Sequence, residues 1–406
     1  MHIKREVETE IERWLEEREI IAIRGPRQSG KTTVLNKIKE NLISRGITEK
    51  MIHYFNFEDD ILRLKFEANC QEFIDFHRQG EHDYFLFDEV QNVKEVGKKL
   101  KLIFDSSKIK VIITGSSSFD LTNLGQYLVG RVIFIDLYPF NFLEFLRTKG
   151  EKYEQLFQKL RIDLINPKIE NTIFLDELNK FLHEYLTFGA YPRVVLENDL
   201  LKKKELLRNL FKTYIEKDVV SLYGNKYRNN VVILLKTLSG MLGGIVKYET
   251  LTESSGLKYR ELRELIPLLE DSFVISTIKP FHKSVVSELR KNPKIYFVDM
   301  GIRNYLLENF ENVNFDSLYE NFVCNELNKR YKLNYWRTTT KSEIDFVINA
   351  KEIIPIEVKT SPKISRALRS FITTYGCKTA LVANLTKASQ EKLDDCKLFT
   401  VPLVYF

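Results

Sequence analysis

The segment at residues 25–32, GPRQSGKT, restricts the fold of this chain more than any other stretch. It follows the apolar run IIAI at residues 20–23 and precedes VLNKIKENL, which has helical spacing. The pattern G-x-x-x-x-G-K-[ST] between a strand and a helix is typical of a loop whose backbone N–H groups surround a polyphosphate. We therefore predict a P-loop in an α/β fold. The expected nucleotide-binding residues are Gly25, Pro26, Arg27, Gln28, Ser29, Gly30, Lys31, Thr32 and Thr33.

Four residues of this loop carry the expected chemistry. Gly25 and Gly30 allow the tight backbone curve. The Lys31 ammonium would reach the β- and γ-phosphates, and the Thr32 hydroxyl would bind Mg²⁺. The predicted cofactors are accordingly ATP and Mg²⁺. The alternative is a glycine-rich turn that carries a lysine by chance.

A second apolar run, YFLF at residues 84–87, ends in the two acids Asp88 and Glu89. A continuous apolar run is typical of a strand that is buried on both faces of a parallel sheet, and such sheets bind ligands at the carboxyl ends of their strands. We expect Asp88 to hold Mg²⁺ through water and Glu89 to act as the base that polarises the attacking water. Alternatively, the two acids cap the next helix.

Three further residues are candidates for contact with the γ-phosphate. The apolar strand at residues 110–114 ends at Thr114 and runs into GSSS, so either Thr114 or Ser116 is a candidate for contact with the phosphate or the water. Arg131, which precedes the strand-like VIFID, is a candidate within its own chain or across a subunit boundary. The alternatives are a Gly/Ser turn that caps a helix and a surface arginine.

Together, GPRQSGKT, LFDE, ITGSSS, GR and LYPFNFLEFL resemble a family of archaeal and bacterial AAA-type P-loop ATPases whose C-terminal region has no known function. FGAYPRVV at residues 188–195 and YIEKDV at residues 214–219 are also similar to that family. The resemblance implies an AAA/ASCE-type parallel sheet. It also implies an ATP site formed by Lys31, Thr32, Asp88, Glu89, Ser116 and Arg131. AAA-type ATPases often complete this site between subunits, which implies a homo-oligomer and leaves open whether Arg131 acts in cis or in trans.

The middle of the chain, residues 226–299, predicts a winged helix-turn-helix. Three helical patterns with a turn before the third are followed by the strand-like FVISTIKPF and KIYFVD. The third helix would offer Lys258, Arg260 and Arg263 to DNA, although neighbouring glutamates dilute this charge, and Pro267 predicts a kink or an early end. The alternative is a packing module between the flanking domains.

The C-terminal part carries Glu320 on a predicted helix, Asp345 on a first strand, and Glu357 and Lys359 on a second. Residues two apart on a strand share a face, so an acid on each strand and a lysine beside the second suit a metal-dependent phosphodiesterase. The segment resembles the PD-(D/E)xK nuclease core, a restriction-endonuclease-like α/β fold. It departs from that core in having Ile344 before Asp345.

Several alternatives remain for this region. Glu320 lies three residues after Ser317, a spacing that also predicts a capping box. The hairpin charges could face water, or an intact set could lie in an inactive domain that holds DNA. Tyr335, Trp336 and Arg337 are candidates for stacking on nucleic acid, and a buried edge strand explains them equally.

Charge and composition agree with a DNA partner without requiring one. The net charge is +6 over 406 residues. Residues 320–369 hold ten Lys or Arg against six Asp or Glu, and three of those acids belong to the predicted metal site. No apolar run is long enough for a membrane span, and the charged N-terminus is unlike a signal peptide, so we expect a cytoplasmic protein. The four cysteines show no metal-site spacing and are expected to be buried thiols.

The sequence thus predicts three domains: residues 1–225, an ATPase domain whose helical extension covers 151–223; residues 226–299, a winged helix; and residues 300–406, a nuclease-like domain. The leading hypothesis is a Mg²⁺-dependent ATPase that remodels or processes duplex or branched DNA. One alternative is an ATP-regulated DNA endonuclease. The other is a nucleotide-dependent switch that signals through protein contacts.

Overall fold

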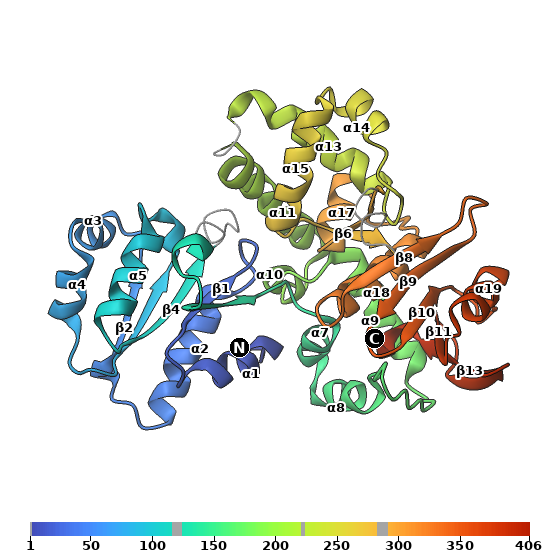
Figure 1. The fold of residues 1–406 in the computed structure, drawn as a ribbon, viewed down its shortest axis with the longest axis horizontal. Coiled ribbons are helices and arrows are strands. Elements are labelled where there is room, and N and C mark those ends of the chain that lie inside the picture. The colour runs from blue at the N-terminus through green and yellow to red at the C-terminus, as the bar shows by residue number, and fades with distance from the viewer. Residues whose placement is uncertain (1, 116–123, 221–223, 282–290) are drawn as a thin grey trace. The chain divides into compact units, whose positions relative to one another are not determined.

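The computed structural model describes residues 2–115, 124–220, 224–281 and 291–406 (Figure 1). The chain forms two compact units. The first comprises Met1–Phe140 with Pro267–Phe273, and the second comprises Asn141–Ile266 with Val274–Phe406. This division differs from the predicted domain boundaries at residues 225 and 299. No helix among the described residues is long and apolar enough to span a bilayer.

The first unit alternates strands and helices in chain order. Its elements are α1 (Glu6–Trp14), β1 (Ile20–Arg24), α2 (Lys31–Ser44), η1 (Glu49–Met51), β2 (Ile52–Asn56), α3 (Asp60–Ala68), α4 (Cys70–His77), β3 (Tyr84–Asp88), η2 (Val90–Asn92), α5 (Val96–Ser106), β4 (Lys110–Gly115) and β5 (Val132–Asp136). The five strands form one parallel sheet in the order β2-β3-β4-β1-β5. This confirms the predicted α/β fold with a parallel sheet.

Both faces of this sheet are buried, as the continuous apolar runs of its strands predicted. Successive residues of a strand point to opposite faces. Ile21 and Leu86 lie in the cluster that α1 and α2 cover. Phe85 and Phe87 lie in the cluster that α3, α4 and α5 cover. The layers are visible in the blue and cyan part of Figure 1.

The strand order brings the predicted nucleotide residues to one edge. Strand β4 lies between β1 and β3, so the carboxyl ends of all three are neighbours. The P-loop follows β1, Asp88 ends β3, and Thr114 lies near the end of β4. Parallel strands therefore place these segments together, although they are far apart in the chain.

The second unit begins with helices and ends with a large sheet. Its helical elements are α7 (Phe142–Lys149), α8 (Glu151–Leu160), α9 (Leu175–Phe188), α10 (Pro192–Val195), α11 (Leu200–Tyr214), the π-helix η3 (Ile215–Val220), η4 (Asn225–Tyr227), α13 (Arg228–Gly240), α14 (Tyr248–Ser255), α15 (Tyr259–Asp271), α17 (Met300–Leu306), α18 (Asp316–Asn328), α19 (Arg366–Tyr375) and η5 (Leu403–Tyr405). Its strands are β6 (Ile275–Pro280), β7 (Lys294–Phe297), β8 (Leu333–Arg337), β9 (Glu343–Asn349), β10 (Ile353–Val358), β11 (Thr379–Asn384), β12 (Ser389–Leu393) and β13 (Cys396–Pro402). Helix α15 also contributes its last residues to the first unit.

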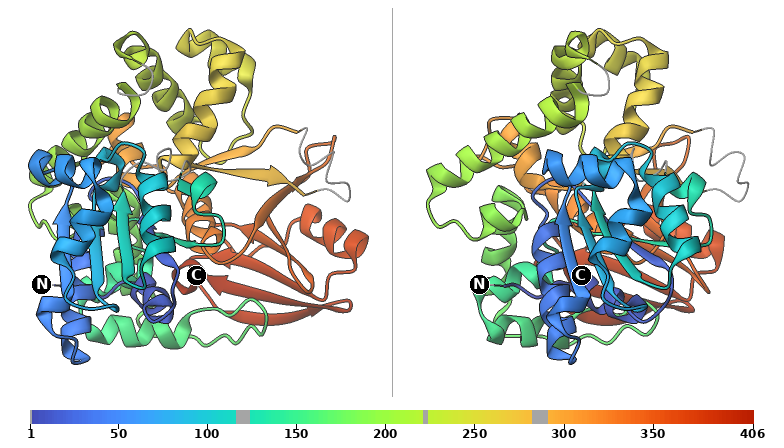
Figure 2. Two further views of the ribbon diagram at one scale, coloured as in Figure 1. Left: turned by 60° about the vertical axis from the view of Figure 1, so that its left-hand side comes forward. Right: turned by 90° about the vertical axis from the view of Figure 1, so that its left-hand side faces the viewer.

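The two strands predicted as a wing belong to this large sheet. Strand β6 pairs antiparallel with β7 and parallel with β8, which extends the order β12-β13-β11-β10-β9-β8-β6-β7 (Figure 2). The three predicted helices are present as α13, α14 and α15, and α15 continues to Asp271 past Pro267. A self-contained winged helix is not confirmed, because the second edge of β6 pairs with β8.

The helices between residues 141 and 225 pack within the second unit, whereas the sequence predicted that they complete the ATPase region. The FGAYP turn shows why. The buried Asp299 carboxylate accepts hydrogen bonds from Ala190 N at 2.6 Å and from Ile302 N at 2.9 Å. A Cβ atom at Gly301 would lie 2.1 Å from Phe188 O. This turn is therefore fixed against the start of α17.

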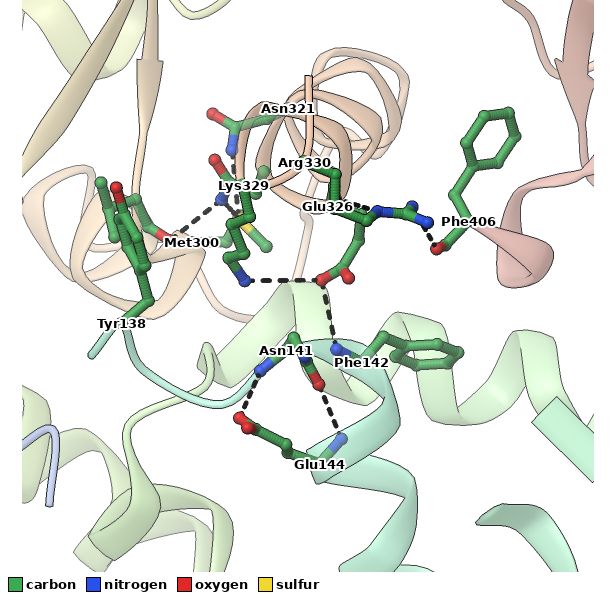
Figure 3. Close-up of polar contacts among 12 residues, drawn as sticks. Tyr138, Asn141, Phe142, Glu144, Met300, Asn321, Glu326, Lys329, Arg330 and Phe406 are labelled. Atoms are coloured by element: carbon green, nitrogen blue, oxygen red, sulfur yellow. Dashed lines mark hydrogen bonds and ion pairs between the residues drawn. The ribbon is translucent and has the colours of Figure 1, made fainter. Parts of the chain in front are cut away.

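Helix α7 is anchored in the same unit (Figure 3). Asn141 and Glu144 form a capping box, in which Glu144 N donates to Asn141 Oδ1 at 2.8 Å and Asn141 N donates to Glu144 Oε2 at 3.1 Å. Glu326 of α18, which is 2 % exposed, accepts a further bond from Phe142 N at 3.2 Å. A carboxylate at the positive end of a helix is stabilising, so the LYPFNFLEF motif has a structural role here.

Candidate nucleotide site

The P-loop adopts a conformation that requires its two glycines. Gly30 has φ +102°, a backbone conformation that residues with a Cβ atom rarely adopt. A Cβ atom at Gly25 would lie 2.1 Å from Leu137 O and 3.1 Å from Ser29 Oγ. The loop is therefore packed directly against the backbone that follows β5.

Polar groups of the loop are positioned for an anion. The Lys31 ammonium donates to Gly25 O at 3.0 Å and to Pro26 O at 2.9 Å, and the side chain is 5 % exposed. Within the described part of the chain, the buried Ser29 hydroxyl has no hydrogen-bond partner. A buried hydroxyl without a partner and a glycine cradle at a helix N-terminus fit a bound phosphate. Gln28 and Thr33 are exposed, and Arg27 is half-buried.

Asp88 links the P-loop to the neighbouring strands. Its buried carboxylate accepts a bond from the Thr32 hydroxyl at 2.7 Å and another from the Thr114 hydroxyl. The first contact joins the expected Mg²⁺ ligands Thr32 and Asp88, so the donor set fits this hard cation. Thr114 contacts the acid, which fits its predicted place beside the phosphate site.

Glu89 has a left-handed backbone conformation with φ 56°. Its N–H donates to Thr114 Oγ1 at 3.3 Å, and its carboxylate accepts a bond from Gln91 Nε2. A non-glycine residue with positive φ is uncommon and stores strain of about 1–3 kcal/mol. The local backbone is thus fixed around Asp88 and Glu89.

Tyr54, in the middle of β2, was not predicted from the sequence as a site residue. Its hydroxyl donates to Asp88 Oδ2 at 3.0 Å. Burial and the Asp88 carboxylate raise the pKa of Tyr54, so this side chain remains a hydrogen-bond donor at neutral pH. A tyrosine within a strand carries no motif, and the contact of Tyr54 with Asp88 follows from the pairing of β2 with β3.

The structure does not bring Arg131 to the P-loop of its own chain. Arg131 precedes β5, and its carbonyl accepts a bond from Ile20 N at the start of β1. Its guanidinium bonds to Asp105 at 2.9 Å. The P-loop follows the other end of β1, about 16 Å away for a five-residue strand. The second candidate, Ser116, lies outside the described residues.

The C-terminal acidic residues form a cluster with a lysine that was not predicted. Lys294 of β7, 1 % exposed, bonds to Glu320 at 2.9 Å and to Glu343 at 2.5 Å. Tyr296 also donates to Glu320, at 2.5 Å. Burial by itself lowers the pKa of Lys294. The carboxylates of Glu320, Asp345 and Glu343 raise it by more, so the pKa lies above its ordinary value and the ammonium is retained.

The other predicted nuclease residues lie next to this cluster. The antiparallel register places Asp345 opposite Glu357, and Lys359 Nζ lies 3.1 Å from Glu357 Oε1. Burial and the Glu320 carboxylate raise the pKa of Asp345. Among the described residues, no three His, Cys, Asp or Glu side chains are arranged to hold a metal ion. A nuclease-like metal centre is therefore not confirmed, and Lys294 supplies a cation at this position.

The residues proposed for stacking on nucleic acid lie mostly inside the sheet. Strand β8 is an interior strand between β9 and β6, not an edge. Tyr335 is 3 % exposed and donates to Asn292 O at 2.8 Å, and Trp336 packs on Phe371 with ring centres 5.1 Å apart. Arg337 is exposed and pairs with Glu343 at 3.3 Å. The four cysteines are buried free thiols, as expected.

Comparison with known proteins divides the chain into three matched regions. Residues 17–146 match a family described as an AAA domain. Residues 179–313 and 315–404 match two families described as domains of unknown function, DUF8612 and DUF4143.

The chain is similar along most of its length to two uncharacterized curated proteins. One, from Haemophilus influenzae, is 27 % identical over 352 residues, which cover 84 % of this chain and 82 % of that protein. The other, from Methanocaldococcus jannaschii, is 27 % identical over 410 residues, which cover 95 % of this chain and 84 % of that protein.

Solved structures with a detectable likeness include AMPPCP-bound DnaA from Aquifex aeolicus, at 14 % identity and a TM-score of 0.32, covering 66 % of this chain and 86 % of that one. A STAND protein from Pyrococcus horikoshii has 15 % identity and a TM-score of 0.29, covering 81 % and 46 %. The family match agrees with the parallel sheet and P-loop already described. The N-terminal part of this chain is thus an AAA-type P-loop ATPase domain.

Proposed function

We propose that this protein hydrolyses ATP in a Mg²⁺-dependent reaction and uses it to act on DNA. The contact between the Thr32 hydroxyl and Asp88 at 2.7 Å carries the first half of this proposal, because it joins the P-loop to the acid of β3. Thr32 and Asp88 would hold Mg²⁺, which would neutralise phosphate charge when bound. Lys31 would bind the phosphates, and Glu89 would orient and deprotonate the attacking water.

Arg131 remains a candidate for action in trans. Its place at the amino end of β5 argues against contact with the nucleotide of its own chain, so the nucleotide of a second copy is the one that it would contact. An oligomer that completes each ATP site with Arg131 is part of this proposal.

The distribution of charge in residues 320–369 supports a DNA partner. Nine of the ten basic residues of this segment are exposed, and Lys359 is the partly exposed exception. Glu352 is the one exposed acid of six. The acids thus point inward and the bases outward, which is typical of a surface that binds phosphate backbones.

Steady-state ATP hydrolysis with Mg²⁺, measured alone and with duplex, single-stranded and branched DNA, tests both halves. We expect DNA to stimulate turnover, Lys31→Ala to abolish it, and Glu89→Gln to bind ATP without hydrolysing it. Normal turnover by Lys31→Ala would refute the site.

The DNA half has its own variants. Arg366→Glu with Arg369→Glu on α19 should weaken DNA binding and the stimulation, and flatten the salt dependence of binding. The matched control is Lys101→Glu on α5, an exposed lysine of the ATPase unit. Slow ATP hydrolysis by the wild type that none of the DNA substrates stimulates would instead favour a nucleotide-dependent switch that acts through protein contacts.

A second candidate function is an ATP-regulated DNA endonuclease at Asp345, Glu357 and Lys359. The observation in its favour is the buried Glu357 Oε2 atom, which has no hydrogen-bond partner among the described residues. Metal-dependent nicking that is lost in Glu357→Ala and kept in Glu352→Ala, with ATPase activity intact in both, would support it. Intact DNA under all conditions would exclude it.

A further inference from the structure

A buried arginine outside every recognised motif contacts the outer side of the P-loop. Arg5 immediately precedes α1 and is 5 % exposed. Its Nη1 donates to Ser29 O at 2.8 Å, and its Nη2 donates to Tyr138 O at 2.6 Å. The guanidinium also lies over the Phe140 ring, 4.8 Å from its centre. One side chain therefore joins the P-loop to residues 137–140.

The first contact bears on the shape of the loop. A loop that turns its N–H groups toward a phosphate must turn carbonyl groups the other way, and a buried carbonyl needs a donor. Arg5 supplies that donor to Ser29 O, directly before the left-handed Gly30. A Cβ atom at Gly30 would lie 3.4 Å from Arg5 Nη1. Arg5 thus supports the turn that presents the loop to the nucleotide.

The second contact, with Tyr138 O, lies in the segment by which the chain leaves the first unit. Residues 137–140 follow β5, and the chain enters the second unit at Asn141. Leu137 N donates to Arg24 O at 2.7 Å, and Leu137 O is the atom that Gly25 approaches. A movement of the P-loop would therefore act on this segment through Gly25 and through Arg5.

Arg5 itself is held in place by its own helix. Its backbone N–H donates to Glu8 Oε1 at 2.9 Å. Ile11 of α1 and Leu15, directly after α1, pack into the apolar cluster to which α2 also contributes. The guanidinium is a planar fork in which Nη1 and Nη2 each donate to a different carbonyl group, whereas a lysine would have to make both bonds from a single nitrogen.

We propose that Arg5 is a positioning residue that couples nucleotide binding at the P-loop to the order of residues 137–140. This inference rests on the proposed nucleotide-binding function. It adds a residue that affects nucleotide affinity without touching the nucleotide. It also adds a path by which nucleotide binding changes residues 137–140, which lead into the second unit.

The test compares the full-length wild type with Arg5→Met, Arg5→Lys and the control Arg18→Met. Arg18 has matching chemistry in the same unit, since it donates to Phe104 O at 3.0 Å and lies 4.5 Å from the Phe104 ring centre. Nucleotide affinity is measured with ADP and a non-hydrolysable ATP analogue. Hydrogen exchange of residues 137–140 is measured with and without each nucleotide.

We expect Arg5→Met to bind nucleotide about tenfold more weakly, since it loses two charge-assisted hydrogen bonds. Nucleotide should slow exchange at residues 137–140 in the wild type and in Arg18→Met but not in Arg5→Met. Arg5→Lys should be intermediate, and it keeps the test decisive if Arg5→Met does not fold.

Unchanged affinity and an unchanged exchange response in the Arg5 variants would overturn the inference. Weaker binding with a normal exchange response would overturn the coupling. If the folded wild type bound nucleotide no better than Lys31→Ala does, the proposed function would be refuted, and this inference with it.

Discussion

Replacing Gly25 by alanine tests the close packing of the P-loop against the segment after β5. The added Cβ atom would lie 2.1 Å from Leu137 O, whereas an ordinary C···O contact is about 3.3 Å. The backbone of Leu137 must therefore move by about 1 Å, which lengthens its hydrogen bond to Arg24 O, now 2.7 Å. The change acts on backbone atoms, so no side-chain rotation relieves it.

The expected cost follows from these contacts. Overpacking a close-packed site costs about 1–3 kcal/mol, and a weakened backbone hydrogen bond adds about 1 kcal/mol. We therefore expect Gly25→Ala to lower the free energy of unfolding of the first unit by about 2–4 kcal/mol. With a urea m-value of about 2 kcal/mol per M, the midpoint should fall by roughly 1–2 M.

The assay needs a probe that reports on the first unit alone, because a chain with two units need not unfold in one step. The chain has two tryptophans, Trp14 on α1 and Trp336 on β8. In a Trp336→Phe background, the fluorescence of Trp14 follows unfolding of the first unit. Gly125→Ala is the control, since a Cβ there would meet no atom within 4 Å. If Gly25→Ala and Gly125→Ala unfolded at the same urea concentration, the reasoning would be wrong.

Two further predictions concern the second unit. Lys294→Met leaves Glu320 and Glu343 without their shared cation, so it should destabilise this unit by about 3 kcal/mol at pH 7. Trp336 fluorescence is the probe, and a urea midpoint equal to that of the wild type would contradict this prediction. Burial raises the pKa of Asp299 to about 6, above its unfolded value, so the folded state binds this proton more tightly and its stability contribution grows as pH falls through 6. Relative to Asp299→Asn, the wild type should gain about 1 kcal/mol between pH 7 and pH 5, and parallel stability curves would count against this assignment.

Local pattern was sufficient for the elements of the nucleotide site. The strand before Gly25, the helix from Lys31 and the strand that ends at Asp88 form where their apolar runs and glycine positions predicted. These segments are specified by residues close in sequence, since strand burial, helix spacing and left-handed turns are local properties.

Position within the sheet was not available from local pattern. Arg131 is next to a strand of the correct sheet but at the wrong end of it, since a strand has two ends about 16 Å apart and the arginine precedes it. Tyr54 and Arg5 reach the site from β2 and from the start of α1, and neither has a motif. Strand pairing and helix packing decide both, through contacts 34 and 133 residues apart in the chain.

The C-terminal region shows most clearly which features follow from the sequence and which depend on the tertiary structure. The sequence determined that Asp345, Glu357 and Lys359 share one face of a hairpin, because side chains alternate along a strand and the turn fixes the register. Only the tertiary structure decided that β6 and β7 extend this sheet and that β7 inserts Lys294 between Glu320 and Glu343. The reason is that the unpaired N–H and C=O groups at a strand edge can pair with many different strands. Which strand pairs there decides which charged side chains are buried together.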